Sequence, residues 1–422
     1  MDYKSLFKIE ILFKVLSKGV GFGKSLILLF LFGFTKALDS YYLALSLTGI
    51  ILSIPVVFEL LFMGELKDKI EGNKLESLQN LGLQFLTIAA TCSLLSIIAV
   101  CFFYQDDVLS NVIILLIWAF FFNLNSFIIL VLRIKQQYKA IGWYFFFFPL
   151  IISVVLFLSY YGFNFKNSII ASLSMLVSEI ILILFLKSKV RSRLFIAEKI
   201  KLKFVFNKKR LSQIIKSFSL ISAVYIIDVT DKSFSYNLEG GYTTVLIYGS
   251  LVPLMVRQAL DFKSVFYHRL QYSYSIKSDL KIFYKTLKWL FYIIAPIMLG
   301  LYIVVQFIEL SLVNKFIDIT NNQFNDLIQV VNVYILILPI YIIWDMMYRI
   351  YYKNDYLNSL FLIMLIGVVL NYVLNYIFVN VLFMKTSGIA LSTFIVLSLY
   401  CSYSFGLLKI KETNELKKIG NQ

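Results

Sequence analysis

Long apolar stretches separated by short polar ones repeat along the whole chain. A helix needs about 20 apolar residues to cross a bilayer, because lipid offers no partner for unpaired backbone groups. We predict twelve transmembrane helices, over 8–33, 41–64, 80–103, 109–132, 141–162, 167–186, 213–237, 242–262, 286–308, 327–350, 357–380 and 387–408. The pattern therefore predicts an all-α polytopic membrane protein.

The longest polar interruption, residues 187–210, divides the predicted helices into two sets of six and holds ten Lys or Arg residues against one acid, Glu198. Because six is even, both sets start from the same side of the membrane, as parallel repeats do. We predict an N-terminal six-helix bundle over 1–190, a basic cytoplasmic linker over 191–210 and a C-terminal six-helix bundle over 211–422. The two bundles are expected to surround a central cavity.

Composition and charge agree with a membrane location. Hydrophobic residues make up 60% of the chain and charged ones 15%, whereas soluble domains carry about 25% charged residues. The net charge is +16, yet the predicted outer loops hold only four of the 40 cations: Lys36, Lys166, Lys315 and Lys385. This positive-inside bias predicts a multi-pass protein of the bacterial cytoplasmic membrane with both termini cytoplasmic. We expect contacts with anionic lipid headgroups and no nucleic-acid partner.

Residues for metal or cofactor chemistry are scarce. Cys92, Cys101 and Cys401 fall inside predicted helices, and His268 is the single histidine. These residues assemble neither a disulfide framework nor a metal site. The sequence also lacks the glycine loop that cradles nucleotide phosphates. We therefore expect no metal and no cofactor, and any driving force to come from an H⁺ or Na⁺ gradient, the membrane potential or removal of the substrate.

Cations inside the predicted helices are the first candidate functional residues. Inserting one such charge into the bilayer costs about 2.5–3.5 kcal/mol, so a charge at this depth usually has a function. The first span carries Lys14, Lys18 and Lys24 on one face. Lys14 and Lys18 could instead extend to the cytoplasmic headgroups. Ammonium and guanidinium groups suit a ligand with an anionic head such as pyrophosphate. We assign pyrophosphate binding to Lys18, Lys24, Lys232 and Arg257.

Carboxylates inside or next to the predicted helices are the second set of candidates. We expect them to pair with the cations when the substrate is absent and to release them when it binds, which would bias two conformations. This coupling or switch role is assigned to Asp39, Glu59, Asp228 and Asp231. The i,i+4 pairs Asp228–Lys232 and Arg257–Asp261 could instead simply neutralise each other.

Three acids stand alone in their predicted helices: Glu59, Glu179 and Asp345. Each is a candidate proton or cation site, and the alternative is a structural role in which the acid bonds a neighbouring Tyr, Ser or Asn.

Several segments resemble one family in order along the chain. "SKGVGFGKSLILLFLFG" resembles the first helix of the MviN-like lipid II flippases, with Lys18 and Lys24 where arginines are usual. "LDSYYLALSL" is similar to their T-D-A-F-F-x-A-x-x-L and aligns Asp39. "DKSFSYNLEGGYTTVLIYG" resembles D-R-x-x-A-S-x-L-x-x-G-x-V-x-x-L-x-Y-A through Asp231 and Lys232. "YYKNDYLNS" and "SGIALST" resemble the Y-A-R-G-D-x-x-x-P turn and A-G-L-A-L-A.

The chain also departs from that family. Leu251 stands where the family has an arginine, and no segment matches the two helices that follow the twelfth in lipid II flippases. A twelve-helix length fits the O-antigen and capsule (Wzx-type) flippases better. The resemblance thus reaches the superfamily of multidrug, oligosaccharidyl-lipid and polysaccharide exporters.

The resemblance implies a flippase that moves an undecaprenyl-pyrophosphate-linked glycan, a polysaccharide repeat unit or a lipid II-like molecule, from the inner to the outer leaflet by alternating access. Other polysaccharide assembly proteins are possible partners. One alternative is a cation-coupled exporter of drugs or metabolites, which the cationic first helix disfavours. Another is a glycan polymerase or ligase, which would need a larger outer loop with Arg, His or paired carboxylates.

Overall fold

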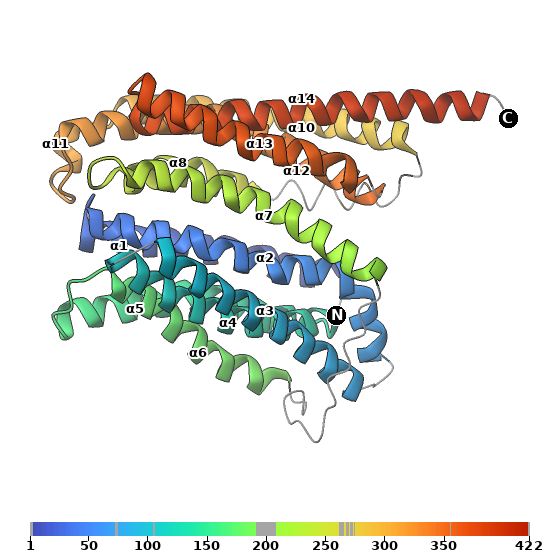
Figure 1. The fold of residues 1–422 in the computed structure, drawn as a ribbon, viewed down its shortest axis with the longest axis horizontal. Helices are drawn as coiled ribbons and strands as arrows, with labels where there is room; N and C mark the ends of the chain where they lie inside the picture. The colour runs from blue at the N-terminus through green and yellow to red at the C-terminus, as the bar shows by residue number, and fades with distance from the viewer. Residues whose placement is uncertain are drawn as a thin grey trace. The chain divides into compact units, whose positions relative to one another are not determined.

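The computed structural model describes residues 3–71, 75–103, 106–190, 208–260, 266, 270, 273, 275–354 and 356–420. These residues form twelve long helices and no strand: α1 (Tyr3–Phe32), α2 (Lys36–Glu71), α3 (Leu75–Phe103), α4 (Asp106–Ile134), α5 (Tyr138–Phe157), α6 (Ile169–Val190), α7 (Lys208–Tyr236), α8 (Tyr242–Leu260), α10 (Ile276–Gln306), α12 (Asn321–Lys353), α13 (Leu357–Tyr376) and α14 (Lys385–Gly420) (Figure 1). A short α11 (Leu310–Val313) follows α10, and π-helical turns η1 (Leu158–Gly162) and η2 (Ile377–Val381) extend α5 and α13. The prediction of an all-α, twelve-helix membrane protein is confirmed.

Among the described helices, nine are long and apolar enough to cross a membrane: α2, α3, α4, α5, α6, α10, α12, α13 and α14. The other three long helices, α1, α7 and α8, do not reach this combination of length, hydropathy and low charge in their described residues. All four residues predicted to bind pyrophosphate lie on these three helices. Because charges facing hydrocarbon are costly, the charged faces of α1, α7 and α8 need protein, water or a ligand beside them.

The chain divides into two compact units, Met1–Tyr225 and Ile226–Gln422, so the division falls inside α7. Most of the predicted linker, residues 191–207, lies outside the described part of the chain. The bundle limits 1–190 and 211–422 therefore stay predictions.

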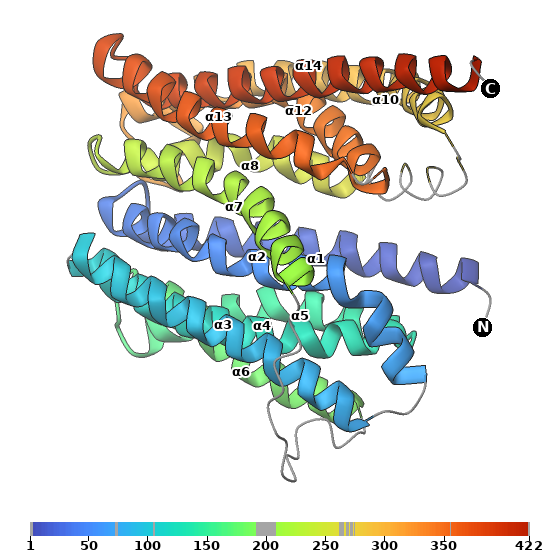
Figure 2. The same ribbon diagram turned by 45° about the vertical axis from the view of Figure 1, so that its right-hand side comes forward.

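In the N-terminal unit, α4 is the central helix and packs against α2, α3 and α6, while α5 packs against α1 and α6 (Figure 2). Apolar residues of α4 such as Val112, Leu115 and Ala119 are fully buried. Gly142 allows α1 to approach α5 closely, since a Cβ there would lie 2.6 Å from the ring of Phe13. The core of this unit thus forms around α4.

In the C-terminal unit, α12 is central and packs against α8, α10 and α14, and α13 packs against α14. Gly249 of α8 faces Val330 of α12 so closely that a Cβ would lie 2.5 Å from its side chain. The apolar residues Leu290 and Ile294 of α10 pack with Leu338 and Ile342 of α12. These contacts fix α8 and α10 on the central helix.

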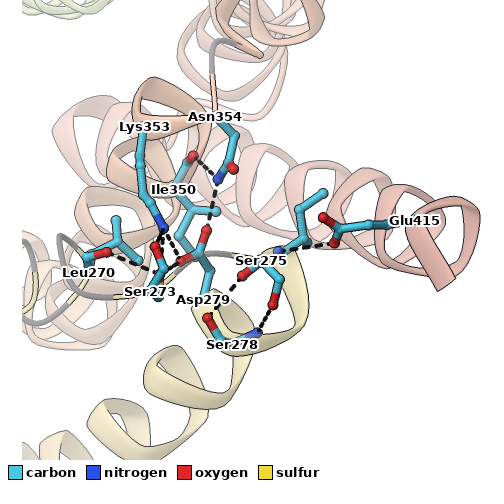
Figure 3. Close-up of polar contacts among 10 residues, drawn as sticks. Leu270, Ser273, Ser275, Ser278, Asp279, Ile350, Lys353, Asn354 and Glu415 are labelled. Carbon is cyan, nitrogen blue, oxygen red and sulfur yellow. Dashed lines mark hydrogen bonds and ion pairs between the residues drawn. The ribbon is translucent and has the colours of Figure 1, made fainter. Parts of the chain in front are cut away.

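A cluster of polar side chains joins the start of α10 to the end of α12 (Figure 3). Asp279 is fully buried there and accepts a 2.6 Å bond from Lys353 and a 2.8 Å bond from Asn354. Lys353 also donates to the carbonyl of Ser273 at 2.9 Å. On α14, Glu415 accepts from the backbone N–H of Ile276 at 3.1 Å. We call Ser273, Asp279, Lys353 and Asn354 the Asp279 cluster; it ties helix ends together.

Candidate functional site

The predicted cations of the N-terminal unit lie on α1. Lys18 is exposed and Lys24 is partly buried, whereas the side chain of Lys14 lies outside the described residues. Among the side chains that the structure describes, none forms a hydrogen bond or ion pair with Lys24. Lys24 therefore carries a positive charge that this part of the chain does not neutralise.

Two predicted switch carboxylates lie on α2. Asp39 is fully buried in the first turn, where the helix dipole favours a negative charge. Glu59, which stands alone in its predicted helix, forms an ion pair with Arg133 of α4, so its partner is a cation and not a Tyr, Ser or Asn. Both side chains of this pair are at least a third exposed, which limits its contribution to stability.

In the C-terminal unit, α7 carries an ion pair within one helix. Lys232 Nζ lies 2.7 Å from Asp228 Oδ2, which confirms the predicted i,i+4 contact. The Lys232 side chain is 15% exposed and that of Asp228 is 46% exposed. The cation is thus the better shielded partner.

Arg257 of α8 is held by Asp345 of α12 through two parallel bonds. Nε donates to Oδ2 at 2.9 Å and Nη2 donates to Oδ1 at 2.8 Å, while the guanidinium lies 4.3 Å from the centre of the Tyr341 ring. Asp345, which stands alone in its predicted helix, is therefore paired with a cation of another helix and not with a Tyr, Ser or Asn. The other predicted partner, Asp261, lies outside the described residues. A guanidinium offers the same forked geometry to phosphate oxygens.

Asp231 occupies a different environment from its neighbours on α7. Its carboxylate is 5% exposed and accepts bonds from Asn371 at 3.0 Å, Asn375 at 2.7 Å and Thr393 at 2.7 Å. Asn371, Asn375 and Thr393 were not predicted from the sequence. The signal that indicates the first two is a pair of asparagines at i,i+4 in the apolar second half of α13. No group of three or more His, Cys, Asp or Glu side chains that could hold a metal occurs among the described residues.

Four predicted site residues belong to the C-terminal unit: Lys232, Arg257, Asp228 and Asp231. Asp345 and Tyr341 of α12 hold Arg257, whereas α13 and α14 supply the partners of Asp231. The other four, Lys18, Lys24, Asp39 and Glu59, belong to α1 and α2 of the N-terminal unit.

Comparison with known proteins adds evidence from structure and none from sequence. No protein-family profile matches the chain, and no curated protein matches it. The solved structures that match include MOP superfamily transporters, and this chain shares their fold. The fold that the sequence resemblance implied is thereby confirmed.

Three of these structures show how far the likeness extends. The inward closed lipid II flippase MurJ matches with a TM-score of 0.70 and 18% identity, over 94% of this chain and 87% of that one. An outward-facing multidrug resistance MATE family transporter matches with a TM-score of 0.66 and 14% identity, over 99% of this chain and 97% of that one. A MOP superfamily transporter from Pyrococcus furiosus matches with a TM-score of 0.64 and 14% identity, over 98% of this chain and 96% of that one. The likeness covers nearly the whole of each chain.

Proposed function

We propose that this protein is a flippase that moves an undecaprenyl-pyrophosphate-linked glycan from the inner to the outer leaflet by alternating access. The observation that carries the proposal is Lys24, a partly buried ammonium on α1 with no partner among the described residues. An ammonium inside a membrane helix is stabilised by protein acceptors, a water-filled cavity or a counter-anion. A lipid that carries a pyrophosphate supplies one.

Lys232, Arg257 and the exposed Lys18 are the further proposed ligands. Lys232 and Arg257 are bound to Asp228 and Asp345 in the described state. The phosphate oxygens of a substrate would replace these carboxylates, and the carboxylates would reclaim the cations after release. Such an exchange gives the empty and loaded protein two different sets of contacts.

We propose that an H⁺ or Na⁺ gradient drives the cycle through Asp231. This carboxylate is nearly buried, and its described partners are two amides and a hydroxyl. A proton or a monovalent cation would neutralise its charge without breaking the cluster. The Asp231→Asn variant should retain binding of the lipid carrier while translocation slows.

A second candidate is a cation-coupled drug or metabolite exporter, which the likeness to MATE family structures favours. Lys24 argues against a cationic drug, because the ammonium would repel it. Export of a neutral or anionic metabolite would require no lipid carrier, so vesicles that contain the lipid-linked glycan distinguish the two functions.

We also propose that the protein lies in the bacterial cytoplasmic membrane with both termini inside, as the distribution of Lys and Arg predicts. Reporters fused after Asp107, Glu239 and Lys385 should lie outside the membrane. Reporters fused after Arg193 and Lys418 should lie inside. An inside signal after Asp107 would contradict this topology.

Reconstituted vesicles test the function directly. An undecaprenyl-pyrophosphate-linked oligosaccharide is placed in one leaflet, and its arrival in the other is followed with a lectin added outside. The wild-type protein should translocate the lipid, Lys24→Ala should lose at least about tenfold in rate, and Lys24→Arg should retain it. The matched control is Lys281→Ala, on an exposed face of α10. No translocation by the wild type, or full activity of Lys24→Ala, would reject the proposal.

A further inference from the structure

Glu179 is a buried acid that the proposed pyrophosphate and coupling sites do not use. It lies about 15 Å along α6 from the start of the helix, near mid-membrane, and is fully buried. The hydroxyl of Tyr144 lies 2.9 Å from Oε1 and 3.1 Å from Oε2. Asn125 donates to Oε2 through its side-chain amide and to the backbone carbonyl of Glu179 at 3.1 Å.

The helices packed around Glu179 bring no described cation to it. On α4 the side chains nearby are Asn125 and Trp118, and Arg133 is held by Glu59. On α5 the facing titratable group is Tyr144. On α2, Tyr41 donates to Met175, one turn away on α6, and Asp39 lies in the first turn of that helix. An ionised carboxylate here would be buried with neutral donors alone, which is costly.

The hydrogen bonds of Tyr144 fit a neutral acid better. A phenol has a single proton, so it can donate to only one of the two carboxyl oxygens. If Glu179 is protonated on Oε2, that O–H donates to the Tyr144 oxygen while the phenol donates to Oε1. Both short contacts are then true hydrogen bonds, and Oε2 keeps a lone pair for Asn125.

We propose that Glu179 is a proton-binding site of the N-terminal unit. A proton from water binds to Oε2 when the helices enclose the side chain, and it returns to water when the helices part and hydrate the carboxylate. Its place in a transport cycle, as a second site beside Asp231, rests on the proposed function. Proton binding itself does not.

Infrared difference spectroscopy on the purified protein, without substrate, tests proton binding. On a change from about pH 9 to about pH 5, the wild type should gain the C=O stretch of a buried carboxylic acid. This band should be missing in Glu179→Gln, shifted in Glu179→Asp and retained in Asp231→Asn. A band that Glu179→Gln leaves unchanged would overturn the proposal. If Glu179→Gln does not fold, Tyr144→Phe replaces it and must shift the same band.

The pH dependence of flipping tests the place in the cycle. Glutamine keeps the size and hydrogen bonds of a neutral acid but cannot release a proton, so Glu179→Gln should bind the lipid carrier normally and turn over at least about tenfold more slowly. Its remaining rate should vary less with pH than that of the wild type. Normal flipping with an unchanged pH profile would overturn this role. If the wild type shows no flipping, the proposed function fails, and the infrared result still decides whether Glu179 binds a proton.

Discussion

Asp279 and Glu179 are both fully buried carboxylates, yet their surroundings differ. Asp279 lies in the first turn of α10 and bonds the ammonium of Lys353. Glu179 lies within α6, and its described partners are a phenol and an amide. Asp279 thus has a cation and the positive end of a helix dipole beside it, whereas the described partners of Glu179 are neutral.

We expect this difference to separate the acids that hold the fold together from those that can change their charge. A buried carboxylate with its own cation holds elements together, as Asp279 does for α10 and α12 (Figure 3). A buried carboxylate without one can change charge when its surroundings open, which is what a proton site requires. The unfolding free energies of variants at these acids can test this difference.

The largest expected effect is at the Asp279 cluster. Lys353→Met leaves Asp279 buried with no countercharge among its described neighbours, so we expect a loss of about 3–5 kcal/mol in the free energy of unfolding. Denaturant unfolding of the purified protein in detergent measures this. Lys281→Met, on the exposed face of the same α10 helix, should change stability by less than about 0.5 kcal/mol.

A double variant, Lys353→Met with Asp279→Asn, removes the uncompensated charge and should recover part of the loss. If it is no more stable than Lys353→Met alone, the ion pair is not the source of the effect.

A smaller loss is expected at Glu179. Tyr144→Phe removes one hydroxyl that contacts both carboxyl oxygens. Hydrogen bonds between neutral groups contribute about 1 kcal/mol, and those to a charged group about 1.5–3 kcal/mol. We therefore expect a loss of about 1 kcal/mol at acidic pH, measured by the same unfolding assay. A loss well above about 2 kcal/mol there would mean that Glu179 is ionised when buried.

The smallest effect concerns the half-exposed pair of α7. Asp228→Asn breaks an i,i+4 ion pair whose carboxylate is 46% exposed, so the stability should fall by only about 0.2–0.5 kcal/mol. The same change frees Lys232, and the purified variant should bind undecaprenyl pyrophosphate as tightly as the wild type or more tightly. Weaker binding would show that Asp228 supports the ligand and does not compete with it.

Hydropathy predicted the helices well because each membrane crossing needs its own apolar stretch. The span predicted at 109–132 is observed as Asp106–Ile134. Among the helix starts, the largest shift is at α10, where the span predicted from residue 286 belongs to a helix that starts at Ile276. Its first turns bury one face, including Leu280 and Phe283, and expose lysines on the other. The hydropathy averaged over both faces is therefore too low for these turns to be recognised as part of an apolar segment.

The partners of the charged residues were harder to predict. The Asp228–Lys232 pair could be read from spacing, since i,i+4 residues share one helix face. Arg257 and Asp345 are 88 residues apart, so their contact depends on how α8 packs on α12. Lys353 and Asp279 lie at helix ends, where charges usually face water, and nothing in the local pattern marks Asp279 as buried.

Binding of the lipid carrier to the purified protein tests the central claim, that cations on α1 hold an anionic lipid head. Native mass spectrometry compares undecaprenyl pyrophosphate with undecaprenol, which has the same chain and no phosphate. The wild type and Lys24→Arg should retain the pyrophosphate, Lys24→Ala should bind it at least about tenfold more weakly, and undecaprenol should bind weakly to all three. Equal binding of the two lipids, or unchanged binding by Lys24→Ala, would show that the α1 cations do not hold the pyrophosphate.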